Sequence, residues 1–376
     1  MAKTSDTKYM QLALRLAAKA KDRTYPNPMV GAVIVKGGRI VGKGYHRRAG
    51  EDHAEIRAIK DSSGKCRGGT LYITLEPCDH YGKTPPCTQS IIKSGIKKVN
   101  IAVKDPNPLN NGRGIRRLRE SGIQVNTGMC AEETLALNRK YVKFVTKGIP
   151  YITLKLAQSV DGKIAARDGT SKWITSETSR RYARKMRSGF DAVMVGANTV
   201  VNDNPLLLGE GKRGNSITRV VVDSGLRIPV SSKLIKTAKR SPVIIATTDR
   251  APKGKLERLR QIKGVDVMVS RGKKVPIRTA LKKFAKKGIV NMMVEGGGEL
   301  AGSLMDKKMV DEVMFFVAPK IIGGNYSSVK GIGAGNIASA VELSDVSFRK
   351  SGSDVLIRGL VNKPLSSRAS VASRGI

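Results

Sequence analysis

Three metal-binding side chains that lie far apart in the sequence constrain this fold more than any other feature. His53 lies early in a helix predicted over 51–60, Cys78 follows a strand predicted over 70–75, and Cys87 precedes a further helical segment. Helix N-termini carry free N–H groups and partial positive charge, which favour thiolates. Three protein donors with an open fourth position are typical of catalytic zinc, whereas structural zinc prefers four protein ligands. If the three bind one ion, two helix N-termini must meet beyond a strand end, which indicates an α/β fold.

Glu55 adds a carboxylate next to these ligands. Zinc nucleobase deaminases bind the metal with one His and two Cys, and a Glu two residues after the His moves protons. Their cysteines are usually spaced Pro-Cys-x-x-Cys, but here residues 79–86 separate Cys78 from Cys87. Two buried cysteines, a surface histidine and a solvated Glu55 are the competing interpretation, which Pro77 and the His-x-Glu spacing argue against. His46 and His80 lack ligand spacing; His80 either contacts substrate or is an ordinary loop residue.

Several segments resemble one family in a fixed order. Residues 75–87 (LEPCDHYGKTPPC) resemble the signature of the bifunctional deaminase–reductases of riboflavin biosynthesis, in which the wider cysteine spacing is normal. Four further segments resemble the reductase half of that family: residues 154–165, 173–176, 196–206 and 294–297. The resemblance runs from about residue 10 to residue 360. It implies an α/β chain: an N-terminal three-layer cytidine-deaminase-like domain followed by a dihydrofolate-reductase-like α/β domain.

The sequence pattern predicts the domain limits. They are 1–146 for a zinc-dependent deaminase and 150–362 for an NADPH-dependent reductase, followed by a tail over 363–376 that is predicted to be disordered because it lacks periodicity. A connecting helix is predicted over 132–145, and a boundary over 147–150.

Two glycine-rich segments lie in the second half of the chain. Gly296-Gly297-Gly298 separates a predicted strand from a predicted helix. It either lets the backbone approach a phosphate or forms a tight turn. The segment 331–335 has neither flanking element and is predicted to be loop.

The residues of the reductase site are carried over from the resemblance. Cofactor contacts are expected at Ala157, Trp173, Thr199, Asp203, Ser224, Gly297, Gly298, Glu299, Leu300, Ala301, Gly302 and Ser303. Substrate contacts are expected at Lys155, Ser171, Arg187, Leu207 and Glu295.

The chemistry of these side chains agrees with such roles. Arg187 suits a ribose phosphate, and Lys155 and Glu295 can bind hydroxyls or move a proton. A solvated helix position for Arg187 and a core position for Trp173 are the alternatives. The family usually places a phosphate-binding arginine after its Asn-Pro-Leu turn. This chain has Leu208-Gly209-Glu210 there, so Lys212 or Arg213 is a candidate for that contact.

These assignments predict two consecutive reactions. With Zn²⁺ activating a water and Glu55 moving its proton, 2,5-diamino-6-(5-phosphoribosylamino)pyrimidin-4(3H)-one would be deaminated. NADPH would then reduce the ribosyl group of 5-amino-6-(5-phosphoribosylamino)uracil to ribityl, because no side chain can supply two electrons. The alternative is a nucleic-acid base deaminase that holds RNA on its basic surface, which leaves the second half without a role.

The amino-acid composition limits the kinds of partner that this chain is expected to bind. The net charge of +39 is spread over both halves, and aromatic residues make up only 4% of the chain, too few for extensive base stacking. We therefore expect small phosphorylated substrates and no nucleic acid. No apolar run is long enough for a membrane span, and four cysteines with two assigned to metal fit a reducing compartment. We expect a cytoplasmic enzyme without a membrane partner that forms a homo-oligomer of unspecified size.

Overall fold

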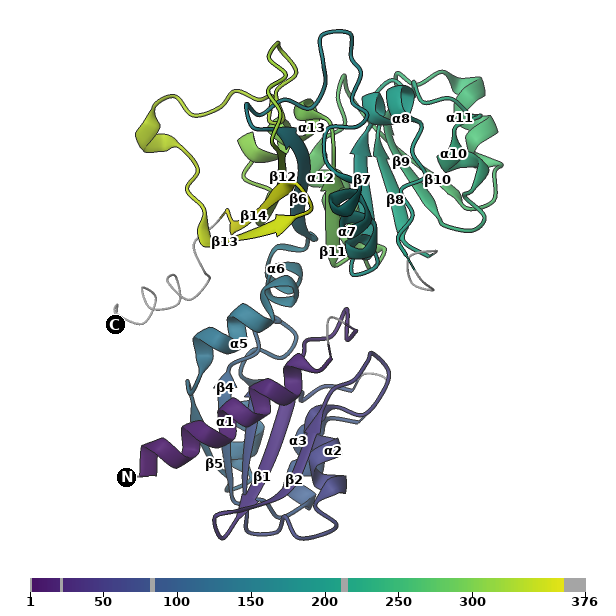
Figure 1. The fold of residues 1–376 in the computed structure, drawn as a ribbon. Helices are drawn as coiled ribbons and strands as arrows, with labels where there is room; N and C mark the ends of the chain where they lie inside the picture. Colours follow the sequence, from purple (N-terminus) through teal and green to yellow (C-terminus); the bar gives the residue numbers. More distant parts are fainter. Residues whose placement is uncertain (1, 21–22, 82–84, 211–215, 362–376) are drawn as a thin grey trace. The chain divides into compact units, whose positions relative to one another are not determined.

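The computed structural model describes residues 2–20, 23–81, 85–210 and 216–361 (Figure 1). The described chain divides into two compact units, residues 2–148 and 149–361. Each unit has its own sheet and its own cores. The tail predicted over 363–376 lies outside the described residues, as do Lys212 and Arg213.

The N-terminal unit is a three-layer sandwich, as predicted. Its helices are α1 (Ala2–Ala18), α2 (Ala54–Asp61), α3 (Cys87–Lys93), α4 (Arg113–Glu120), α5 (Ala131–Leu137) and α6 (Arg139–Lys147). Its strands are β1 (Gly31–Lys36), β2 (Arg39–Tyr45), β3 (Thr70–Leu75), β4 (Lys98–Val103) and β5 (Gln124–Thr127). The sheet order is β2-β1-β3-β4-β5, with β1 antiparallel to both neighbours and β3, β4 and β5 parallel.

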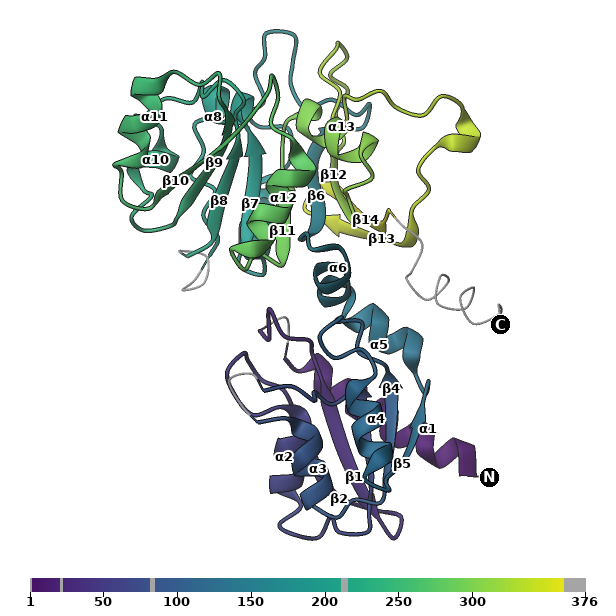
Figure 2. The same cartoon turned by 180° about the vertical axis from the view of Figure 1, so that it is seen from behind.

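The alternation of strand residues explains the layers. Alternate residues of β1 face opposite sides, so Val33 and Val35 pack with α1, whereas Ala32 and Ile34 pack with α2, α3 and α4. Figure 1 shows α1 across one face of this sheet, and the view from behind in Figure 2 shows the helices of the other face. The parallel strands β3 and β4 run between the two helix layers.

Two sequence predictions in this unit need correction. The single connecting helix over 132–145 is two helices, α5 and α6, that meet at Asn138. The buried Asn138 side chain pairs with the backbone of Met29, accepting from its N–H (2.8 Å) and donating to its carbonyl (2.9 Å). This long-range pairing fixes Asn138 outside helical geometry. The helix predicted from residue 51 begins at Ala54, because His53 is extended (φ −69°, ψ 166°) as its N-cap.

The C-terminal unit is built on a nine-stranded sheet. Its strands are β6 (Tyr151–Ser159), β7 (Ala192–Gly196), β8 (Thr218–Val222), β9 (Val243–Thr248), β10 (Val265–Ser270), β11 (Asn291–Glu295), β12 (Glu312–Ala318), β13 (Ser344–Ser351) and β14 (Asp354–Leu360). The order is β10-β9-β8-β7-β11-β6-β12-β14-β13, parallel from β10 to β12 and antiparallel beyond. The helices are α7 (Glu177–Arg187), α8 (Ala197–Asp203), α10 (Lys233–Lys236), α11 (Lys253–Arg260), α12 (Ile277–Lys286) and α13 (Gly298–Asp306).

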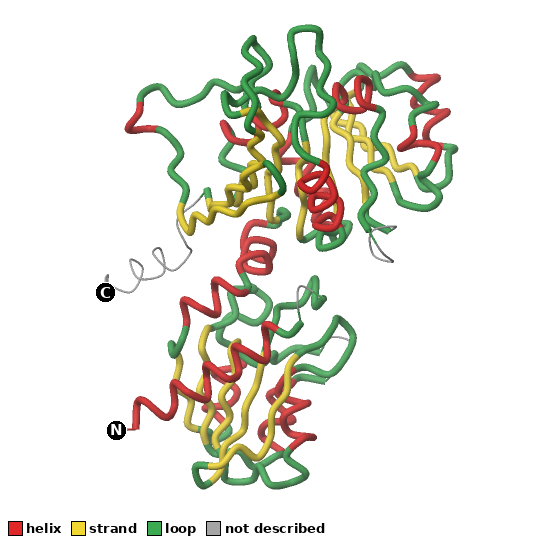
Figure 3. The backbone as a smooth tube through the Cα atoms, viewed as in Figure 1, coloured by secondary structure: helices red, strands yellow, loops and turns green. Residues whose placement is uncertain are grey.

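Helices cover both faces of this sheet, as parallel strands require. The cores assign α12 and α13 to one face and α7, α8, α10 and α11 to the other. The short helices α8, α10 and α11 and the edge strand β13 were not predicted. Figure 3 shows the loops of this unit in green, among them the long connection from β12 to β13. This connection contains the predicted loop over 331–335. Among the described helices, none is both long and apolar enough to cross a membrane.

Candidate active sites

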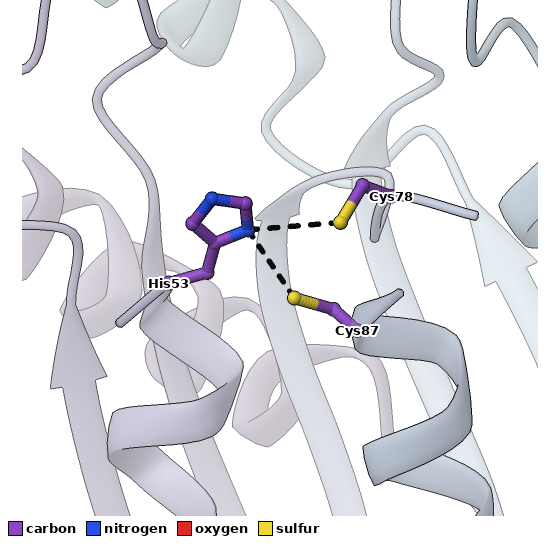
Figure 4. A group of neighbouring side chains, drawn as sticks. All are labelled: His53, Cys78 and Cys87. Atoms are coloured by element: carbon purple, nitrogen blue, oxygen red, sulfur yellow. Dashed lines mark hydrogen bonds between the residues drawn. The ribbon is translucent and has the colours of Figure 1, made fainter. Parts of the chain in front are cut away.

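The structure brings the three predicted metal ligands of the N-terminal unit together. His53 caps α2, Cys78 follows β3, and Cys87 begins α3. His53 Nδ1 lies 3.7 Å from Cys78 Sγ and 3.2 Å from Cys87 Sγ, and both sulfurs point at the imidazole (Figure 4). All three donor atoms lie within 4.8 Å of one another. Tetrahedral zinc with ordinary Zn–N and Zn–S bonds needs N–S separations of about 3.5 Å, so the donor set fits zinc.

Glu55 lies in the first turn of α2, buried beside these donors with only 3% of its surface exposed. Among the described residues, the three-donor cluster does not include it. Burial raises the pKa of the Glu55 carboxyl above its ordinary value. Glu55 is therefore a buried carboxyl, electrostatically coupled to the three donors, that can hold a proton.

The donors influence one another electrostatically. The hydrogen bond with Cys78 raises the pKa of His53 to about 9. The hydrogen bond from Cys87 lowers the pKa of the Cys78 thiol to about 4, and the same contact raises the pKa of Cys87. The local environment thus favours a thiolate at Cys78, which is the form that binds metal.

Two neighbours of the cluster were missed as functional candidates. The ring of His46 lies edge-on to His53, with 5.1 Å between centroids. Its Nδ1–H donates to the carbonyl of Asp52 (3.2 Å), and its Nε2 accepts from the amide of Asn27 (3.2 Å). Burial lowers the pKa of His46, so this imidazole stays neutral. No local spacing marks either residue, because Asn27 precedes β1 and His46 follows β2, and only the antiparallel pairing of these strands brings them together.

His80 lies in the loop that follows Cys78. Its side chain is half-buried, and its Nδ1 is buried with no hydrogen-bond partner within the described chain. The substrate contact of His80 stays a prediction.

In the C-terminal unit, three predicted substrate residues form one buried ionic group. Lys155 and Glu295 are register partners on the parallel strands β6 and β11, and Arg187 ends α7. Glu295 Oε2 lies 3.5 Å from Lys155 Nζ and 2.8 Å from Arg187 Nη2, and Glu295 Oε1 accepts from Arg187 Nε. The alternative of a solvated Arg187 is wrong, because only 14% of its side-chain surface is exposed.

The charges of this ionic group fix its protonation. Burial alone would raise the pKa of Glu295, but Arg187 and Lys155 outweigh it and lower that pKa to about 2. Burial lowers the pKa of Lys155 below its ordinary value despite the nearby carboxylate. Glu295 is therefore an ionised acceptor, and Lys155 gives up a proton more readily than an ordinary lysine.

Other predicted contacts lie in the loops and short helices near the strand ends. Ser171 donates to Asp203 Oδ1 (2.8 Å) at the end of α8, and Arg187 Nη1 donates to the carbonyl of Leu208 (3.1 Å). The core alternative for Trp173 is wrong: the ring is 62% exposed, with the Arg180 guanidinium 4.2 Å from its centroid.

The glycine run turns from β11 into α13, as predicted. Gly296 (φ 68°) and Gly297 (φ 76°) have left-handed backbones and face the Thr199 hydroxyl. A Cβ at Gly298 would collide with the carbonyl of Ser327, and one at Gly302 with the carbonyl of Lys330. These two glycines therefore let α13 pack closely against the segment 327–330, and their cofactor contacts stay a prediction that only their backbone can fulfil.

The remaining predicted contacts differ in exposure. Ala301 is fully buried in the core, and Leu207 (φ 53°) is 5% exposed with its side chain in a second core. Neither side chain can reach a ligand, so only their backbone groups are available. Ala157, Leu300 and Ser303 are half-buried, and Glu299 is exposed. Ser224 follows β8, and its hydroxyl accepts from Val275 N–H (3.1 Å).

Two family models match the chain. Residues 3–103 match the cytidine and deoxycytidylate deaminase zinc-binding region, and residues 150–357 match the RibD C-terminal domain. A riboflavin biosynthesis protein RibD of Aquifex aeolicus is 42% identical over 358 residues, which cover 95% of this chain and 99% of the relative. The chain belongs to the RibD family. The RibD protein of Escherichia coli is 35% identical over 94% of this chain and 98% of its own length.

Solved RibD structures have the same two-part fold. The deaminase/reductase of Thermotoga maritima matches with a TM-score of 0.79 at 35% identity, covering 96% of this chain and all of its own. A RibD structure of Acinetobacter baumannii matches with a TM-score of 0.82 at 30% identity, covering 96% of this chain and 99% of its own. The predicted cytidine-deaminase-like and dihydrofolate-reductase-like domains are thereby confirmed.

As a RibD enzyme, this protein is a bifunctional deaminase and reductase of riboflavin biosynthesis that uses zinc and NADPH. The predicted family, activities and cofactors are confirmed. The alternative of an RNA deaminase is not favoured, because residues 150–357 match a reductase domain.

Proposed function

We propose that the N-terminal site deaminates 2,5-diamino-6-(5-phosphoribosylamino)pyrimidin-4(3H)-one and that the C-terminal site reduces 5-amino-6-(5-phosphoribosylamino)uracil. The Thermotoga maritima relative carries the names of these two activities. The observation that carries the proposal is the pairing of a three-donor cluster with a buried carboxylate in one unit and a buried ionic group in the other.

In the first reaction His53, Cys78 and Cys87 hold zinc. When bound there, zinc lowers the pKa of a water toward neutrality. Glu55 would take a proton from the attacking water, whose oxygen bonds to the amine-bearing ring carbon, and would give that proton to the amine, which leaves as ammonia when the C–N bond breaks. Its burial supports this role, because a carboxyl with a raised pKa can carry the proton between the two steps. His46 packs edge-on against the ligand His53, and its hydrogen bonds to Asp52 and Asn27 hold that ring in place.

In the second reaction NADPH supplies the hydride that reaches C1′ of the ribosyl group. Lys155 is the proton donor of the ionic group, because burial lowers the pKa of its ammonium group. Glu295 is the acceptor for ribosyl hydroxyls, because it stays ionised. Arg187 holds Glu295 in place through two N–H groups, and its Nη1 is bonded to the carbonyl of Leu208. Positioning Glu295 is therefore a further role for Arg187, besides the phosphate contact.

The remaining cofactor contacts are proposed for the loops around the strand ends. Trp173, Thr199, Asp203, Ser224 and Gly297 have side chains or backbone within this region, and Trp173 offers an exposed aromatic face. Any contacts from Gly298, Ala301, Gly302 and Leu207 use their backbone. Which basic residue binds the phosphate stays a proposal, with Lys212 and Arg213 outside the described residues.

Domain limits of 1–146 and 150–362 are part of the proposal and agree with separate sheets and cores. Residues 1–146 made alone should release ammonia from the diaminopyrimidine without NADPH. We also propose cytoplasmic action, since all four cysteines are free thiols, and a homo-oligomer. The edge strand β13 supports self-association, because Phe348 there is 71% exposed.

The test is incubation of the zinc-loaded full chain with the phosphorylated diaminopyrimidine, with and without NADPH, followed by mass spectrometry. Without NADPH only the deaminated uracil should accumulate, and with NADPH it should gain two hydrogens. A starting compound that is untouched under both conditions would refute the proposed substrate.

A further inference from the structure

The loop between the two cysteines creates a positioning problem for the zinc site. Residues 79–86 separate Cys78 from Cys87, whereas in a Pro-Cys-x-x-Cys sequence both sulfurs come from one turn. A longer loop has more conformations, so fixing its ends costs more chain entropy. Something other than the loop must hold the two sulfurs at the separation that one metal ion requires.

Two hydrogen bonds join the ends of this loop. Thr88, directly after Cys87, donates its N–H to the carbonyl of Cys78 (3.3 Å). Its hydroxyl donates to Oδ1 of Asp79, directly after Cys78, at 2.6 Å. Thr88 has no exposed surface, so water does not compete for these bonds. Thr88, the neighbour of Cys87, is thus hydrogen-bonded both to Cys78 and to its neighbour Asp79.

A third side chain fixes Cys78 from the opposite side. Asn110 has no exposed surface, and its amide brackets the cysteine: Nδ2 donates to the carbonyl of Pro77 (3.2 Å), and Oδ1 accepts from the N–H of Asp79 (3.0 Å). Nδ2 also donates to Asp105 Oδ2 (3.3 Å), which anchors the amide to the loop after β4. Only a side chain with both a donor and an acceptor can make this bracket.

We propose that Asp79, Thr88 and Asn110 form a thiolate clamp that presets Cys78 and Cys87 for zinc. The proposal rests on the assignment of zinc to these cysteines. The clamp residues are positioning residues: they touch the backbone beside the ligands and each other, and no donor atom of the cluster. Because the sulfurs are held before the metal arrives, zinc binding need not order the loop ends. Groups that orient metal ligands in this way typically change metal affinity by about 10–100-fold when removed.

The experiment measures zinc affinity of the full chain by competition with a chromogenic chelator. Thr88→Val replaces the hydroxyl by a methyl group of similar volume, and Asn110→Leu removes both bracket bonds. We expect about 10–100-fold weaker zinc binding in each, as for other groups that orient ligands. Thr88→Ser should restore affinity, because it restores the hydroxyl. Asn111→Leu and Thr127→Val, at exposed positions, are the matched controls and should bind zinc like the parent.

A purely structural role gives a different result. In that case the thermal unfolding temperature of the chelator-treated protein would fall, while zinc affinity of the folded protein stayed within about threefold of the parent, and the clamp would be refuted. If Asn110→Leu does not fold, the smaller change Thr88→Val decides. Failure of the zinc assignment itself is separate: it would appear as full zinc content in Cys87→Ser, whatever the clamp variants do.

Discussion

The two sites of this protein solve the problem of buried charge in opposite ways. The deaminase site places two sulfurs, an imidazole and a buried carboxyl together and depends on an added cation. The reductase site needs no added cation, because Lys155 and Arg187 compensate the buried carboxylate of Glu295. The ligands of the first lie between residues 53 and 87, whereas the charges of the second lie between residues 155 and 295, on β6, α7 and β11. Loss of metal should therefore disable the first site and leave the second unaffected.

Removing a zinc ligand should produce the largest effect. Cys87→Ser removes a thiolate that cannot be replaced by a neutral hydroxyl, so zinc and deamination should both be lost. Zinc content measured by atomic absorption checks this, with Cys130→Ser as the control that keeps one zinc per chain. Reduction of the pre-deaminated uracil should continue in Cys87→Ser. Its loss would break the contrast between the two sites.

Glu55→Gln separates chemistry from metal binding. All three ligands remain, so zinc content should stay at the parent level, but the amide cannot carry a proton. Ammonia release should fall by roughly 10²–10⁴-fold, the range of general acid–base catalysis. Turnover within a few-fold of the parent would refute the role given to Glu55.

Glu295→Gln removes the negative charge of the reductase site and so tests the comparison at the second site. Glu295→Gln leaves Lys155 and Arg187 buried without their carboxylate, a change that costs about 3–5 kcal/mol in buried ion pairs. The C-terminal unit should unfold at a lower denaturant concentration, and reduction should fall. Glu257→Gln, at an exposed position on α11, is the matched control. Unchanged stability in Glu295→Gln would contradict the conclusion that these buried charges stabilise one another.

The smallest expected effect is a pH dependence. The pKa of Glu295 is about 2 in the folded chain against an ordinary 4.5. A lowered carboxyl pKa contributes stability above pH 4.5, and that contribution is lost as the pH falls toward 2. Chemical unfolding across this range should therefore show a steeper decline for the parent than for Glu295→Gln. Equal slopes would place the acid sensitivity in other carboxyls.

The same contrast explains what the sequence could predict. The metal donors follow a local spacing, so His53, Cys78 and Cys87 can be identified from the sequence alone. The contacts of Asn27, His46 and Asn110 cannot, because they join segments that meet only in the folded sheet. Asn138 ends a helix because it pairs with the backbone of Met29, more than a hundred positions away. Local helix propensity carries no information about such a long-range contact.

In the reductase half, the resemblance supplied candidate positions but not the direction in which each side chain points. Lys155, Arg187 and Glu295 were expected at the site, and the structure brings them into contact. Ala301 and Leu207 lie in the same segments but point into cores, since neighbouring residues on a helix or turn face different sides. The side chains of a run of consecutive residues therefore cannot all face one ligand, although their backbone groups can.

The most direct test of two independent sites is the product pattern of Glu295→Gln. The variant is incubated with the phosphorylated diaminopyrimidine, NADPH and zinc, and the products are followed by mass spectrometry. Separate sites predict that ammonia is released at the parent rate and that the deaminated, unreduced uracil accumulates. If ammonia release fell as strongly as reduction of the pre-deaminated uracil, the assignment of the two reactions to separate sites would be contradicted.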